Sequence, residues 1–260
     1  MELTFFKYEG TGNDFIMVDN RSATFPKHDV KWVARLCDRR FGIGADGLIL
    51  LEPDDQTDFR MVYYNSDGNP SSMCGNGGRC IVAFAKKLGI VEDRAVFIAT
   101  DGLHHATIAQ DGTVSLQMKD VDTVETHGGF TFLDTGSPHH VQLEENLGDL
   151  DVRSSGAKIR YSTRYGQAGT NVNFVRPEPD GTFSIRTYER GVEDETLSCG
   201  TGATAAAIAM HATGKTDHNA IIVHVQGGRL GVSFEAASGR YANVWLTGPA
   251  QFVFKGMISC

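Results

Sequence analysis

Two short stretches, Met73-Cys-Gly-Asn-Gly-Gly78 and Ser198-Cys-Gly-Thr-Gly-Ala203, decide how this chain folds. Each places one cysteine directly before a run of small and apolar residues that predicts a buried helix. Cys74 and Cys199 are separated by 125 positions (199 − 74), and several glycines recur downstream at the same offset. The pattern indicates a duplicated unit with one cysteine at the start of a helix in each copy.

Strand-like runs surround both predicted helices, so each half is expected to be several mainly antiparallel strands and one apolar helix. The second helix, over 202–213, has no polar face in its first turns and therefore has to be enclosed. Helices and strands do not alternate regularly, which disfavours a doubly wound parallel sheet. The expected fold class is α+β, with two pseudo-symmetric domains, 1–118 and 119–249, each a curled, mostly antiparallel sheet around a central helix.

The first half is predicted to contain a further helix over 28–41, with Asp29 as its N-cap and Gly42 at its end. The turns at 10–13 and 169–171 look alike, but they are 158 positions apart (171 − 13) whereas the cysteines are 125 apart. The sequence therefore predicts about 33 extra residues in the first half, which would hold this helix and the loop after it.

Composition excludes several classes of protein. The chain has 260 residues and a net charge of −8, which argues against general nucleic-acid binding. No apolar run approaches the roughly 20 residues that span a bilayer, and the N-terminus lacks the pattern of a secretory signal, so the cytoplasm is expected. The cysteine spacing suits neither a disulfide framework nor a zinc site, and no metal is expected. We interpret Cys37, Cys80 and Cys260 as small buried or incidental thiols.

The duplicated cysteines suggest a particular chemistry. At a helix N-terminus, unpaired backbone N–H groups and the helix dipole favour a thiolate and can also bind a carboxylate. Glycines beside each cysteine let a ligand approach those amides closely. Two such starts suggest a carboxylate held between them, with one thiolate removing an α-proton and the opposite thiol returning a proton to the other face. This scheme needs no pyridoxal cofactor, and no lysine motif for one is evident.

Seven motifs, in order along nearly the whole chain, together resemble diaminopimelate epimerases: Phe5…Gly10-Thr-Gly-Asn-Asp-Phe15, Arg40-Phe-Gly-Ile-Gly-Ala-Asp-Gly47, Asn65-Ser-Asp-Gly68, Met73 to Cys80, Gly136-Ser-Pro-His139, Gly169-Thr-Asn-Val-Asn173 and Tyr188 to Ala203. The resemblance implies interconversion of LL- and meso-2,6-diaminopimelate by two thiols without a cofactor, on the route to lysine and peptidoglycan. It also implies an active site in the cleft between two similar halves, a last strand, 250–260, that returns to the first domain, and often a homodimer.

The resemblance assigns roles to residues that match these motifs. Cys74 and Cys199 would be the base and the acid. The amides of Gly75, Asn76, Gly200 and Thr201 would hold the reacting carboxylate, and Asn13, Asn65 and Asn171 would hydrogen-bond the substrate. Arg190 would clamp the distal carboxylate, Glu189 would meet an ammonium or orient the reacting end, and His139 would lie beside the thiols and tune them.

Each assignment has a plainer interpretation. Asn13 and Asn65 could bond only their own turns, and Glu189 with Arg190 could be an exposed charged pair. His139 and its neighbour His140 could be surface residues.

Two positions depart from the pattern. Some family members have a glutamine where Gly47 stands and an asparagine where Ser137 stands, and both side chains touch substrate there.

Three rival functions have to be compared with the sequence. A racemase of the proline or hydroxyproline type shares the fold and the cysteine pair, but it usually carries histidine where this chain has Asn76 and needs no clamp like Arg190. Phenazine-pathway isomerases share the scaffold but lack the cysteines. A dithiol redox sensor is the rival of a different class, and it leaves Arg190, Glu189 and the asparagines unexplained.

Overall fold

A computed structural model describes residues 2–71 and 73–259 of the chain, so Cys260 lies outside the described residues. The chain divides into two compact units. Unit 1 consists of two segments, the chain up to Leu116 and the chain from Gly248 onward. Unit 2 is the segment between them, Gln117–Thr247. In the described part of the chain, no helix is both long and apolar enough to cross a membrane.

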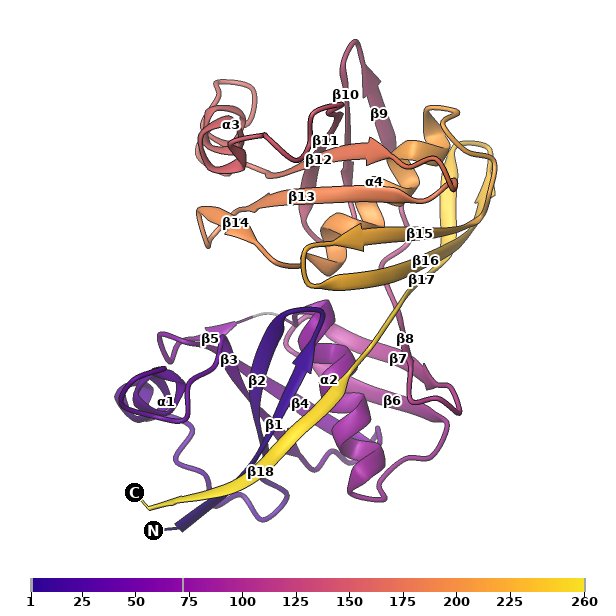
Figure 1. Ribbon diagram of the computed structural model, residues 1–260. Coiled ribbons are helices and arrows are strands. Elements are labelled where there is room, and N and C mark those ends of the chain that lie inside the picture. Colours follow the sequence, from indigo (N-terminus) through magenta and orange to yellow (C-terminus); the bar gives the residue numbers. More distant parts are fainter. Residues whose placement is uncertain (1, 72, 260) are drawn as a thin grey trace. The chain divides into compact units, whose positions relative to one another are not determined.

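Most strand pairs of unit 1 are antiparallel, and the exceptions among its described strands are the parallel pairs of β2 (Asn13–Asp19) with β3 (Gly47–Glu52) and of β4 (Phe59–Asn65) with β6 (Arg94–Ala99). The last strand, β18, pairs with β1 from Glu2–Ser259 onward, so the end of the chain completes the sheet that its beginning starts (Figure 1). The strands, in order of pairing, are β18 (Gln251–Ser259), β1 (Glu2–Gly10), β2 (Asn13–Asp19), β3 (Gly47–Glu52), β4 (Phe59–Asn65), β6 (Arg94–Ala99), β7 (Gly102–Ile108) and β8 (Val114–Gln117), with β5 (Pro70–Ser71) paired to Tyr63 and Tyr64 of β4.

Helix α2 (Gly75–Lys87) begins directly after Cys74 and is the central helix of unit 1 (Figure 1). Its residues from Gly75 to Val82 are all buried. The other helix, α1 (Val30–Cys37), is shorter than the predicted 28–41, although its predicted N-cap is confirmed because the Asp29 carboxylate accepts from the Trp32 amide. It ends where Asp38 turns to an extended conformation and uses its side chain to accept from the amides of residues 40 and 41.

Unit 2 repeats this plan strand for strand. Its parallel pairs, β11–β12 and β13–β15, stand where unit 1 has β2–β3 and β4–β6. The strands, in order of pairing, are β9 (Val124–His127), β10 (Phe130–Asp134), β11 (Pro138–Leu143), β12 (Asn171–Pro177), β13 (Phe183–Glu189), β15 (Ala220–Val225), β16 (Gly228–Ala237) and β17 (Arg240–Gly248), with β14 (Asp194–Thr196) on β13.

Helix α4 (Gly200–Ala212) is the counterpart of α2, and its run from Gly202 to Met210 is buried on every side. The predicted α+β class, with a curled and mostly antiparallel sheet around a central helix in each half, is confirmed. A helix absent from the sequence prediction, α3 (Val152–Arg160), joins β11 to β12. Its Gly156 lies against Tyr188, because a Cβ added there would be 2.3 Å from the Tyr188 Cβ.

The helix α3 corrects the prediction of about 33 extra residues in the first half. Phe15 pairs with Gly47 in β2–β3, and His139 pairs with Asn171 in β11–β12. Both members of the second pair lie 124 positions beyond those of the first (139 − 15 and 171 − 47), so the two halves are nearly equal in length. Asn171 is therefore the counterpart of Gly47 and not of Asn13, and the likeness of the two glycine turns was misleading.

Candidate active site

The thiol of unit 1 stands at the N-terminus of α2. Cys74 is its N-cap residue, with extended backbone angles and no capping hydrogen bond from its side chain, and it is half-buried. The Gly78 amide donates to the Cys74 carbonyl at 2.7 Å, which closes the first turn. Since the first amides of a helix have no acceptor within it, this turn is suited to hold an anionic group beside the sulfur.

A buried arginine supports this turn, and sequence reasoning missed it although it lies within the quoted cysteine motif. Arg79 has no exposed surface. Its guanidinium donates to Asn76 Oδ1 at 3.0 Å, to Thr11 Oγ1 at 3.1 Å and to the Gly75 carbonyl at 3.3 Å. Burial lowers the pKa of Arg79, whereas charge interactions with Cys80 and Cys74 raise it. The guanidinium thus fixes the first turn of α2 and places a positive charge under the Cys74 end.

Asn13 is tied to the same turn. Its Oδ1 accepts from Asn76 Nδ2, and its own Nδ2 donates to Asp46 Oδ2 at 3.0 Å. The structure therefore brings Asn13, Asn76 and Cys74 together. Asn65 ends β4 opposite Gly47, at the same end of the sheet, and is exposed. Both asparagines stay candidates for substrate contacts.

The thiol of unit 2 stands in the equivalent place, as the N-cap residue of α4. Cys199 is 7% exposed, and its Sγ lies 3.5 Å from Thr201 Oγ1. A hydrogen bond from Thr135 Oγ1 to the Thr201 carbonyl, at 2.9 Å, holds the turn. Gly202 is required here, because a Cβ at that position would lie 2.5 Å from Asn173 Oδ1 and 3.2 Å from Cys199 Sγ.

His139 reaches this turn through Asn173, another residue without a role in the sequence analysis. Asn173 Nδ2 donates to the His140 carbonyl at 3.1 Å and its Oδ1 accepts from Thr187 at 3.0 Å, so the orientation of the amide is fixed. The remaining Nδ2 hydrogen then points to His139 Nδ1, 3.0 Å away, which must accept. His139 is consequently a neutral imidazole that carries its proton on Nε2, and this atom has no partner among the described residues.

The pH dependence of stability follows from this environment. Burial lowers the pKa of His139 to about 3, below its ordinary value near 6.5. Because the unfolded chain binds this proton and the folded chain does not, stability should fall as the pH falls from 6.5 towards 3. We expect the variant His139→Gln to lose less thermal stability than the parent over that range, as measured by scanning calorimetry. An identical fall in both proteins would contradict the assignment.

Arg190 lies in a cluster with Asn171 and Ser137. The Arg190 amide donates to Asn171 Oδ1 at 2.8 Å, and its guanidinium donates to the Ala168 carbonyl at 3.2 Å and to Ser137 Oγ at 3.3 Å. Asn171 Nδ2 also donates to Ser137 Oγ, at 2.9 Å. Glu189 accepts from Thr196 Oγ1 at 2.9 Å. Glu189 and Arg190 are thus part of an ordered, half-buried network and not an exposed charged pair.

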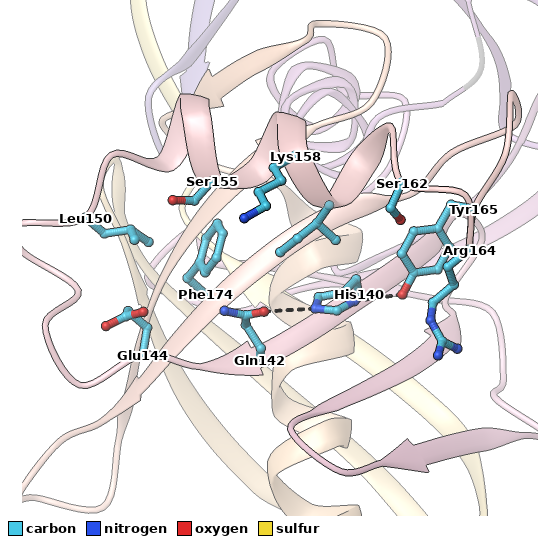
Figure 2. Close-up of a pocket in the computed structure, with 11 residues that line it drawn as sticks. His140, Gln142, Glu144, Leu150, Ser155, Lys158, Ser162, Arg164, Tyr165 and Phe174 are labelled. Carbon is cyan, nitrogen blue, oxygen red and sulfur yellow. Dashed lines mark hydrogen bonds between the residues drawn. The ribbon is translucent and has the colours of Figure 1, made fainter.

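The interpretation of the two histidines as surface residues is wrong for both. His139 is 0% and His140 is 5% exposed. Because neighbouring side chains of a strand point to opposite faces, His140 points away from the Cys199 turn. It lines a pocket of about 460 Å³ between α3 and the sheet, where it bonds Tyr165 Oη at 2.7 Å and Gln142 Oε1 at 3.1 Å (Figure 2). That pocket holds neither cysteine.

Cys37 and Cys80 agree with the interpretation as small buried thiols. Cys37 and Cys80 are buried, and burial raises the pKa of Cys37 to about 12 and that of Cys80 further. No group of three or more histidine, cysteine or acidic side chains placed to hold a metal occurs among residues 2–71 and 73–259.

Two solved structures show that this fold occurs in other proteins. The chain matches a phenazine biosynthesis protein of the PhzF family from Bacillus anthracis with a TM-score of 0.78 at 13% identity, over the whole of both chains. It matches a probable proline racemase from Agrobacterium radiobacter with a TM-score of 0.69 at 18% identity, over 99% of this chain and 93% of that one. The chain thus has the same fold as these two proteins.

Sequence similarity identifies the family. A family model described as diaminopimelate epimerase matches residues 5–124 and 131–253. The diaminopimelate epimerase of Flavobacterium psychrophilum is 64% identical over 97% of this chain and 99% of its own length. That of Chlorobaculum tepidum is 43% identical over 96% and 99%. The chain belongs to the diaminopimelate epimerase family.

Proposed function

We propose that this chain interconverts LL- and meso-2,6-diaminopimelate, a step towards lysine and peptidoglycan, with Cys74 and Cys199 as the proton-transferring groups. The observation that carries the mechanism is the duplication itself: each unit presents one cysteine as the N-cap of its central helix, with a glycine directly after it. Membership of the diaminopimelate epimerase family supports the reaction and its substrate.

In this mechanism one thiolate removes the α-proton and the other thiol delivers a proton to the opposite face of the same carbon. The sulfur that starts as a thiol ends as a thiolate, so protons balance and the two roles exchange when the reaction runs backwards. The negative charge that develops on the reacting carboxylate would be stabilised by the amides of Gly75, Asn76, Gly200 and Thr201. The neutral His139, held as an Nε2–H donor, would contribute a hydrogen bond near Cys199 and would not act as a base.

The distal end of the substrate needs different groups. Arg190 has a planar guanidinium whose geometry matches a carboxylate, and its anchoring by Ala168 and Ser137 would hold it in place. We assign it to the distal carboxylate, Glu189 to an ammonium group, and Asn13, Asn65 and Asn171 to further hydrogen bonds with the substrate.

The experiment that tests the proposal is α-proton exchange in deuterated water with fresh thiol reductant. LL-diaminopimelate should take up deuterium at the α-carbon and yield the meso form without any added cofactor. Proline, hydroxyproline and lysine should show neither exchange nor inversion. Inversion of proline with an inert diaminopimelate would favour the proline-racemase alternative, and no exchange with any substrate would favour a dithiol sensor.

We also propose that two copies of the chain associate through β18. This strand pairs only with β1 among the described strands, and it exposes Val253 by 53% and Met257 by 69%. Large exposed apolar side chains on an edge strand favour pairing with another chain. Light scattering should give about twice the 28.2 kDa of one chain, and the variant Val253→Lys/Met257→Lys should give a single chain. An unchanged mass in the variant would contradict the proposal.

We place this activity in the cytoplasm, where thiols are kept reduced. Cell fractionation that finds the protein outside the cytoplasm would contradict this.

A further inference from the structure

The space that a side chain at position 47 would occupy is filled by Tyr63. A Cβ added to Gly47 would lie 2.4 Å from Tyr63 Cε2 and 3.0 Å from its hydroxyl oxygen, and 2.6 Å from the Tyr64 carbonyl oxygen. Gly47 itself pairs with Asn65 across β3–β4 and with Phe15 across β2–β3. The ring of Tyr63 therefore crosses over Gly47, and its hydroxyl lies where the first atoms of a longer side chain would begin.

Tyr63 is also connected to the Cys74 turn. Its backbone pairs with Ser71 in β5, three positions before Cys74. Its ring meets Phe15 edge-on, with 6.1 Å between the ring centroids. Phe15 in turn approaches the first turn of α2, because a Cβ added to Gly77 would lie 3.6 Å from it. Tyr63 thus lies on the face of the sheet that α2 covers, close to the end of α2 at which Cys74 stands.

The chemistry of the hydroxyl suits a zwitterionic ligand. A tyrosine hydroxyl can donate a hydrogen bond to a carboxylate or accept one from an ammonium group. The ring is half-buried and packed, so holding the hydroxyl in place costs little conformational entropy. Asn65, assigned to the substrate above, is two residues further along the same strand and therefore on the same face.

We propose that Tyr63 is a substrate-binding residue of this chain and that its hydroxyl hydrogen-bonds a charged group of bound diaminopimelate, in the place that a side chain at position 47 would otherwise fill. This inference rests on the proposed function. The Tyr63 ring and the Tyr64 carbonyl oxygen together leave no room for a side chain at position 47, which accounts for the glycine there.

The test is Tyr63→Phe, with Tyr64→Phe as the matched control. Both variants lose one hydroxyl from adjacent residues of β4, but Tyr64 points to the opposite face, into the cluster formed with α1. A hydrogen bond to a charged group is worth enough to raise KM about tenfold. We expect Tyr63→Phe to raise KM for diaminopimelate by about that factor with kcat within about twofold, while Tyr64→Phe leaves both constants unchanged.

The outcomes separate this inference from the proposed function. An inactive parent chain would overturn the proposed function itself. An active parent with an unchanged KM in Tyr63→Phe would overturn only the role of Tyr63. A lowered melting temperature with an unchanged KM would show that the hydroxyl supports packing alone, which also overturns it.

Discussion

Replacing either Cys74 or Cys199 by alanine should abolish epimerisation. General acid–base transfer by a positioned group contributes about 10²- to 10⁴-fold, and the proposed inversion uses two such groups in every turnover. We therefore expect kcat to fall by at least about 10³-fold in each variant, measured as conversion of LL- to meso-diaminopimelate. Cys37→Ala is the matched control, because this thiol is buried among core residues and should leave kcat unchanged.

Proton exchange in the same variants gives a sharper result than the loss of turnover. In the proposed mechanism each single variant keeps the thiol for one side of the α-carbon, so it should retain slow exchange with one epimer and lose exchange with the other. Cys74→Ala and Cys199→Ala should differ in which epimer they exchange. Full turnover in either variant, or exchange of the same epimer by both, would rule out the two-thiol mechanism.

Replacing Arg190 by lysine should have the next largest effect. Lysine keeps the positive charge but loses the fork that fits a carboxylate with two parallel hydrogen bonds. It would also lose one of the anchors that the guanidinium makes with Ala168 and Ser137. We expect KM for diaminopimelate to rise by about 30- to 100-fold, corresponding to about 2 to 3 kcal/mol for a charge-assisted hydrogen bond, with a smaller fall in kcat.

A second arginine in unit 2 provides the control for this prediction. Arg176 lies at the far end of β12 and pairs with Glu178 at 2.8 Å, so Arg176→Lys should leave KM unchanged. A KM for Arg190→Lys within threefold of the parent would mean that Arg190 only organises the loop at Ala168.

The sequence predicted the features that depend on local pattern. A helix that is apolar on every side has to be enclosed by other elements, and α4 is buried in this way. A cysteine directly before such a helix becomes its N-cap residue whatever the details of the sheet. The Asp29 cap of α1 was also predictable, because the capping interaction is between residues three apart in sequence.

The features that the sequence did not reveal depend on packing across strands. Helix α3 contains Ser154, Ser155 and Gly156, which are weak helix formers, and Gly156 is explained only by its contact with Tyr188. The roles of Asn173 and Arg79 depend on partners on other strands or loops. Neighbouring tyrosines on β4 look alike in the sequence, and only the pairing register shows which of them crosses Gly47.

The return of β18 to unit 1 has a consequence for synthesis of the chain. Unit 2 is one continuous segment, Gln117–Thr247, inserted between β8 and β18, so it can close its sheet before the residues that complete unit 1 have been made. Until those residues arrive, β1 presents an unpaired edge to other nascent chains. At about 5–20 residues per second, β18 follows the end of unit 2 within about three seconds, which keeps that exposure short. Unit 1, whose synthesis starts first, is thus the unit whose sheet is completed last.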